Sequence, residues 1–297
     1  MKLVFWIQSL TPQGGGVELL NPAVGVLNRL YGASDVLGVI SPKGTGLNGV
    51  KSLSAADLSA LDYDYILLTG YKASPVPLIQ AGIDENKIVP DRAVCTPFFT
   101  IEKYKKLRHS QLSILSMNCF AGLLYNRFGL PFLSPTVNMF TTDKDFLKFL
   151  KNPQKNVEAK LKLLRTARND ALKIDYPVFK IGDVEWEMNH YDDANFAKQK
   201  WKERGGRINW FNLLVTMYTE NPEILAEFDK LPYAKKICLV PFQSELDSAY
   251  YIDPVKYNVG KDFWRIVNGV ATGAVVEFEI FDMLLYGKKT PLKVKTN

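Results

Sequence analysis

The sequence has few of the residues that build disulfide-bonded or zinc-dependent folds. It holds 3 cysteines and 2 histidines in 297 residues, and no two cysteines form a CxxC pair. The odd number and wide spacing of Cys95, Cys119 and Cys238 indicate neither a disulfide framework nor a metal site. Unpaired thiols of this kind are typical of a reducing cytoplasm, which is where we expect the protein to act.

Long apolar runs are also missing. No stretch of about 18 or more apolar residues occurs, so the sequence predicts no transmembrane helix. The first residues, MKLVFWIQSLTPQGGG, contain only a short apolar run and no small-residue cleavage site, which argues against a secretory signal. What is present is ordinary globular composition, 47% hydrophobic and 23% charged, with ample material for a core.

The net charge of +6 arises from basic residues that are interleaved with acidic ones. Such runs usually form solvated helix faces, and no nucleic-acid-binding motif occurs, so we expect no nucleic-acid partner. The positive excess favours weak attraction to phosphorylated substrates or to an anionic lipid surface, and it is therefore compatible with peripheral membrane association.

Strand and helix patterns alternate through the first hundred residues. Short apolar runs bounded by turn residues predict strands, and apolar residues at helical spacing predict helices. The predicted strands are 3–7, 35–40, 64–69 and 87–89, and the predicted helices are 17–31, 54–61 and 76–82. This alternation predicts parallel βαβ units, hence an α/β chain that begins with a Rossmann-like domain.

A basic segment at 101–109 ends this series, and we expect a domain boundary there. Residues 1–109 would form the Rossmann-like domain and residues 110–297 a second α/β domain. In the second domain the patterns predict strands at 112–115, 178–181, 184–188 and 236–241, helices at 120–127, 143–149, 156–172, 193–204 and 224–230, and a mixed apolar segment at 208–217.

The segment from strand 112–115 to the following helix carries the clearest chemical signal. Asn118 and Cys119 stand at the junction, where the first turn of a helix presents unpaired N–H groups and a partial positive charge. That environment favours a thiolate and an oxyanion, so Cys119 is a candidate nucleophile and Asn118 a candidate oxyanion donor. The alternative is that Cys119 is a small buried side chain at a tight junction.

A thiol nucleophile needs a base, and His190 is the better of the two histidines. His109 lies in the basic segment, whereas His190 and Tyr191 directly follow a strand in which apolar residues alternate. Ends of strands are where α/β folds place side chains that contact ligands. If the strands before Cys119 and His190 share a sheet and a direction, the two side chains meet at one edge, with Asp192 or Asp193 orienting the imidazole.

Two further polar segments are candidates for substrate binding. Ser134, Thr136 and Asn138 form a loop that is either a rigid proline turn or a set of hydroxyl and amide ligands for a sugar. In WKERGGRINW, arginine and tryptophan side chains are suited to holding a phosphate and stacking on a ring, although such a segment is also typical of an exposed helix end. The candidates in that segment are Arg204, Arg207, Asn209 and Trp210.

A triple glycine, Gly14, Gly15 and Gly16, follows the first predicted strand, where a dinucleotide fold keeps its phosphate loop. The spacing differs from G-x-G-x-x-G, and no acidic ribose ligand ends the second strand. The glycines are therefore either a flexible turn or a site for a phosphate-bearing ligand.

Three segments resemble a bacterial family of unknown function whose members are often labelled exopolysaccharide or capsule biosynthesis proteins. They are LSILSMNCFAGLLYNRFGLPFLSPTVNMF, YPVFKIGDVEWEMNHYDDANFAKQKW and RGGRINWFNLLVTMY. The resemblance implies a two-domain α/β protein of a surface-carbohydrate pathway, with a sugar or polysaccharide precursor as partner. The Asn-Cys junction is also similar to that of a capsule acetyltransferase family with a thiol centre.

Together these features favour a transferase that moves an acyl group to a sugar hydroxyl. Cys119 or His190 would activate the reactants, and a coenzyme A thioester or a nucleotide sugar would be the donor. Two alternatives stay open. The first is a nucleotide-sugar glycosyltransferase, which usually needs a basic clamp for the donor diphosphate or a metal-binding acidic motif, for which Asp183, Glu185 and Glu187 are the candidates. The second is a non-catalytic sugar-binding or scaffold protein of the same pathway.

Overall fold

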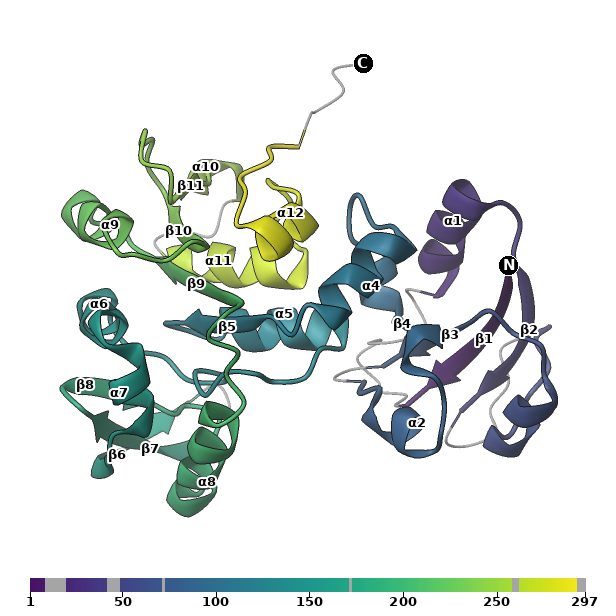
Figure 1. The fold of residues 1–297 in the computed structure, drawn as a ribbon, viewed down its shortest axis with the longest axis horizontal. Coiled ribbons are helices and arrows are strands. Elements are labelled where there is room, and N and C mark those ends of the chain that lie inside the picture. Colours follow the sequence, from purple (N-terminus) through teal and green to yellow (C-terminus); the bar gives the residue numbers. More distant parts are fainter. Residues whose placement is uncertain (9–19, 42–48, 71–72, 171–172, 258–261, 293–297) are drawn as a thin grey trace. The chain divides into compact units, whose positions relative to one another are not determined.

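The computed structural model describes residues 1–8, 20–41, 49–70, 73–170, 173–257 and 262–292 (Figure 1). Its contacts divide the chain into two compact units. Unit 1 contains Met1–Arg108 and Asn126–Leu130, and unit 2 contains His109–Tyr125 and Pro131–Asn297. That these units fold as independent domains stays a prediction. No helix among the described residues is long and apolar enough to cross a membrane.

Unit 1 is built on a four-stranded parallel sheet in the order β2-β1-β3-β4. The reversal of order beside β1 is that of an open, doubly wound α/β sheet. Its elements are β1 (Lys2–Ile7), α1 (Leu20–Tyr31), β2 (Asp35–Ile40), η2 (Ala55–Ala60), β3 (Tyr65–Thr69), α2 (Val76–Gln80), η3 (Glu85–Lys87), β4 (Ile88–Pro90), α3 (Asp91–Val94) and α4 (Ile101–His109).

Unit 2 contains two sheets. The first is parallel, in the order β11-β10-β9-β5, and the second is antiparallel, in the order β6-β7-β8. The strands are β5 (Ser113–Ser116), β6 (Leu161–Asn169), β7 (Ile174–Ile181), β8 (Val184–Glu187), β9 (Leu213–Tyr218), β10 (Lys236–Val240) and β11 (Ala249–Tyr251). Parallel sheets with helices in both units confirm the α/β class.

The helices of unit 2 connect these strands or follow the last of them. They are α5 (Phe120–Phe128), which continues into unit 1, and α6 (Asp143–Lys151), α7 (Pro153–Glu158), α8 (Ala194–Gly205), α9 (Pro222–Asp229), α10 (Pro254–Tyr257), α11 (Phe263–Thr272) and α12 (Ile280–Tyr286). An aromatic cluster joins three of these elements, because Phe149 of α6 and Trp201 of α8 both pack on Trp186 of β8. This cluster fixes the strand that precedes His190.

One predicted helix of unit 2 is wrong. The predicted helix 156–172 is the end of α7 followed by β6, because antiparallel pairing with β7 overrides the helical preference of its leucine, lysine and arginine residues. The strand before Cys119 is an edge strand: β5 pairs only with β9 among the described strands.

Candidate active site

Cys119 lies where β5 passes into α5. Its carbonyl accepts the first helical hydrogen bond, from the N–H of Leu123 at 3.0 Å. The side chain of Asn118 caps the helix, because its Oδ1 accepts from the N–H of Phe120 at 3.1 Å and from the hydroxyl of Ser116 at 3.0 Å. The predicted junction is therefore present, and a buried, hydrogen-bonded asparagine holds it in place.

The thiol of Cys119 contacts the imidazole of His190. Sγ and Nε2 are 3.3 Å apart, within the reach of a hydrogen bond to sulfur. Cys119 is half-buried and His190 is exposed, so the pair is accessible to a substrate. A thiol and an imidazole at this distance have the geometry of a nucleophile and its general base.

The strands that precede the two residues are arranged differently from the shared sheet that the sequence suggests. Cys119 follows the parallel sheet and His190 the antiparallel sheet, so their strands do not share a sheet. The segment before α6 joins the two. Phe140 pairs with Glu187 at the end of β8 through both backbone hydrogen bonds, and the N–H of Thr141 donates to Met117 just after β5.

Burial controls the charge of the thiol. Desolvation raises the pKa of Cys119 to about 11, which opposes the thiolate that the helix N-terminus was expected to favour. The sequence predicts a lowered pKa for this thiol, whereas burial raises it. At neutral pH a thiol with this pKa stays protonated unless a neighbouring base takes the proton, and His190 Nε2 is in position to do so.

The first turn of α5 offers donors to a developing oxyanion. Among the described residues, the backbone N–H groups of Cys119, Ala121 and Gly122 have no protein acceptor. Asn138 approaches the same turn: a Cβ at Gly122 would lie 2.9 Å from its Oδ1. Asn138 holds a left-handed backbone, with φ at 63°, to make this approach. Of the predicted sugar-binding loop, Asn138 is the residue that reaches the turn beside Cys119.

Tyr191 and Arg204 fix the loop behind His190. Tyr191 donates its hydroxyl hydrogen to the carbonyl of Val137 at 3.1 Å, and Arg204 donates to the Tyr191 oxygen at 2.6 Å. The guanidinium of Arg204 also lies 5.0 Å from the ring of Phe132. Arg204 is thus buried and engaged by protein groups, and these contacts lend no support to the phosphate-binding role expected from the sequence.

Ser134 and Thr136 are fully buried. Their hydroxyls lie 3.0 Å apart, and Thr136 Oγ1 accepts from the N–H of Ser116 on the outer side of β5. The two hydroxyls thus provide a hydrogen-bond partner for a backbone N–H at the edge of β5. Neither hydroxyl reaches the surface, where a sugar would bind.

The rest of the predicted binding set lies elsewhere. Asn209 hydrogen-bonds to Ser113 and Gln111, at the end of β5 opposite Cys119. Arg207 is exposed and bonds back to Glu203, and Trp210 lines a separate hollow. Gly14, Gly15 and Gly16 lie outside the described residues.

Two further asparagine side chains lie near the pair or directly beside it in the sequence. Asn268 of α11 accepts a long hydrogen bond from Nδ2 of Asn118 at 3.5 Å. The two residues are far apart in the sequence, so no local pattern predicts this contact. Asn189 carries a buried Oδ1 without a hydrogen-bond partner among the described residues, directly before His190. Unsatisfied buried acceptors of this kind are often found at functional sites.

The comparison with known proteins places this geometry in a family. A domain described as "Domain of unknown function (DUF1919)" matches residues 91–284, which include both Cys119 and His190. The chain belongs to this family. A relative from Haemophilus influenzae, named "Uncharacterized protein", is 30% identical over 154 residues, which are 50% of this chain and 71% of the relative.

Proposed function

We propose that this protein is an acyltransferase in which Cys119 carries the acyl group between a thioester donor and a sugar hydroxyl. The observation that carries the proposal is the 3.3 Å contact of Cys119 Sγ with His190 Nε2 at the start of a helix. Nucleophile, base and helix N–H donors are the three parts that covalent acyl transfer needs.

In the first half-reaction, His190 Nε2 accepts the Sγ proton while Sγ attacks the thioester carbonyl carbon. The N–H groups of the first turn of α5 stabilise the oxyanion that forms. The intermediate expels the donor thiolate, which takes the proton from His190, and the acyl group stays on Sγ. In the second half-reaction, a sugar hydroxyl attacks this acyl group, its proton passes to His190, and Sγ leaves and is reprotonated.

A sugar acceptor is supported by the resemblance to exopolysaccharide and capsule proteins. The glycosyltransferase alternative loses support from the contacts of its candidate residues. Glu185 and Glu187 form ion pairs with Arg165, and Glu187 also accepts from Tyr176. Side chains engaged in this way are poorly placed to hold a donor diphosphate through a metal. A cytoplasmic location and contact with a membrane surface stay proposals.

The test is transfer from acetyl-coenzyme A, followed as release of coenzyme A with a panel of sugars or with water as acceptor. Cys119→Ala and His190→Ala should each abolish release, and the double variant should be no worse than either, because residues that act as one unit fail together. Asn195→Ala is the matched control, since this residue is exposed at the start of α8 and belongs to none of the candidate sites. Full activity of Cys119→Ala would reject the proposal, and no release in any protein would favour the scaffold alternative.

A further inference from the structure

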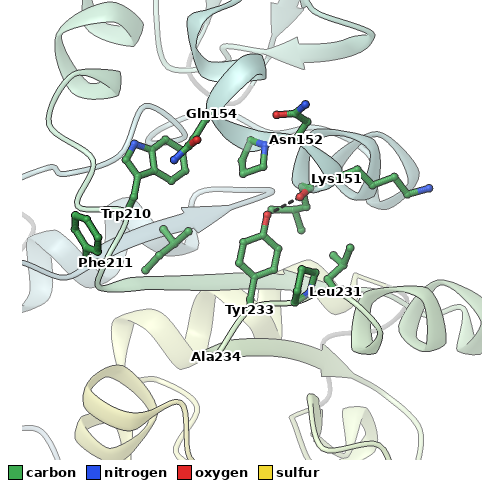
Figure 2. Close-up of a pocket in the computed structure, with 12 residues that line it drawn as sticks. Lys151, Asn152, Gln154, Trp210, Phe211, Leu231, Tyr233 and Ala234 are labelled. Atoms are coloured by element: carbon green, nitrogen blue, oxygen red, sulfur yellow. Dashed lines mark hydrogen bonds between the residues drawn. The ribbon is translucent and has the colours of Figure 1, made fainter.

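Unit 2 has a hollow at the end of the parallel sheet where its strands begin, whereas Cys119 lies where β5 ends. Its volume is about 630 Å³, and the turn between α6 and α7 and the segments before β9 and β10 line it (Figure 2). Leu213, one of the residues that line it, pairs with Ser113 at the start of β5, whereas Cys119 follows the end of that strand. The hollow is thus separate from the Cys119–His190 pair.

Aromatic rings from distant segments gather at this hollow. Trp210 and Phe211 come from the segment before β9, and Tyr233 comes from the turn before β10. Tyr233 is held in place by its hydroxyl, which donates to the carbonyl of Leu150. Phe211 is fully exposed to solvent. Because Phe211 is next to the half-buried Trp210 and shares the hollow with Tyr233, it belongs to a contiguous aromatic patch, and such patches often mark binding sites.

The polar side chains at the hollow are mostly uncharged. Asn152 and Gln154 are exposed along the α6–α7 turn, as Figure 2 shows, and Lys151 is the one charged residue among the 12 that line the hollow. The smaller hollow beside it adds Glu158 and Lys202, whose charges are opposite, so the combined lining has little net charge and lacks the clustered cations that usually hold phosphates. Amide groups both donate and accept, which suits ligands that carry neighbouring hydroxyls.

A second hollow continues the first. It has a volume of about 300 Å³, lies against α7 and the end of α8, and shares Gln154 and Trp210 with the larger hollow. A ligand that fills both would pass over the indole of Trp210. This extent fits a chain of several rings better than one small molecule.

We infer that the two hollows form a binding groove for a neutral oligosaccharide. The apolar C–H faces of its sugar rings would pack on Trp210 and Phe211, and its hydroxyls would bond to the amides of Asn152 and Gln154. The inference deepens the proposed function, because it names a neutral glycan as the acceptor class and gives a long acceptor a second point of attachment away from Cys119. The catalytic role of the groove rests on the proposed acyl transfer, whereas glycan binding can be tested without an acyl donor.

The test is isothermal titration calorimetry of the whole protein with neutral hexasaccharides of glucose, galactose, mannose and N-acetylglucosamine. At least one should bind, and Phe211→Ala and Gln154→Ala should each weaken it roughly tenfold. Trp210→Ala should do the same, but this residue packs on the core, so the two exposed positions decide. Trp264→Ala, which removes an exposed tryptophan of α11, is the matched control and should bind normally.

Cys119→Ala should bind the same hexasaccharide with unchanged affinity, which separates failure of the groove from failure of the acyl-transfer proposal. Three results would overturn the inference: no heat with any hexasaccharide up to roughly 10 mM, binding that survives Phe211→Ala and Gln154→Ala, or a dimer in solution that Phe211→Ala dissociates, since the surface would then be a contact between two copies of the chain.

Discussion

Replacement of His190 by glutamine tests whether the imidazole controls the reactivity of Cys119. Burial raises the pKa of the thiol to about 11, so without a base only about 10⁻⁴ of the thiol ionises at pH 7. An ordinary thiol with a pKa of about 8.5 is roughly 3% ionised at that pH. Cys119 in His190→Gln should therefore react with an alkylating agent roughly 300-fold more slowly than an ordinary thiol.

In the wild-type protein His190 Nε2 lies within reach of the Sγ proton, so we expect it to raise the reactivity of the thiol by accepting that proton. We expect wild-type Cys119 to react at least as fast as an ordinary thiol, about two orders of magnitude faster than in the variant. The variant rate should rise tenfold per pH unit toward pH 11, because a raised pKa moves ionisation to higher pH.

The assay is timed reaction with iodoacetamide, followed by mass spectrometry of the cysteine-containing peptides. Cys95 serves as an internal reference, because burial and the nearby Asp91 also raise its pKa to about 11. His190 is exposed, so its replacement should leave the free energy of unfolding almost unchanged. Equal rates for Cys119 in the wild type and in His190→Gln would refute the reasoning.

Three further substitutions test other contacts. Gly122→Ala should lower transfer activity, because its Cβ would lie 2.9 Å from Asn138 Oδ1 and push that side chain from the first turn of α5. Arg204→Met should lower the free energy of unfolding by about 1–3 kcal/mol, through loss of the bond to Tyr191, without weakening nucleotide binding. Burial raises the pKa of Asp91 to about 6, so ionisation of this carboxyl destabilises the folded state as pH rises from 4 to 6. Asp91→Asn removes that ionisation and should therefore raise the free energy of unfolding at pH 7 by about 2–3 kcal/mol.

Each of these substitutions has a control or a clear contrary result. Gly25→Ala in α1, where a Cβ meets only Arg29 at 3.7 Å, should leave activity intact and stabilise the helix by up to about 1 kcal/mol. Exposed Arg207→Met should change the free energy of unfolding by less than about 0.5 kcal/mol. For Asp91→Asn, denaturant unfolding at pH 4 and pH 7 should give different stability changes, and equal changes would contradict the shift.

The sequence predicts most of the local structure around the candidate site. The apolar run before Cys119 and the helical spacing after it place the thiol at a helix start, and the alternation of Val184 and Trp186 places His190 after a strand. These features depend on neighbouring residues only. The contact itself depends on the pairing of Phe140 with Glu187, which joins two sheets and leaves no periodic signal.

Arg204 shows where composition misleads. An arginine near two glycines at a helix end resembles an exposed phosphate ligand. Its position in the helix indicates burial instead. Spacings of four and three residues place Arg204 on the same face as Ala197 and Trp201, and this is the buried face of α8. The sequence therefore held the signal for burial, but the partners of Arg204 on the 132–137 loop could be known only from the fold.

The most direct test of covalent transfer is mass spectrometry of the intact protein after incubation with acetyl-coenzyme A and no acceptor. We expect one acetyl group, located on the peptide that contains Cys119, which is absent from Cys119→Ala and disappears when a sugar acceptor is added. An unmodified wild-type protein that nevertheless releases coenzyme A at the same rate as Cys119→Ala would contradict the account.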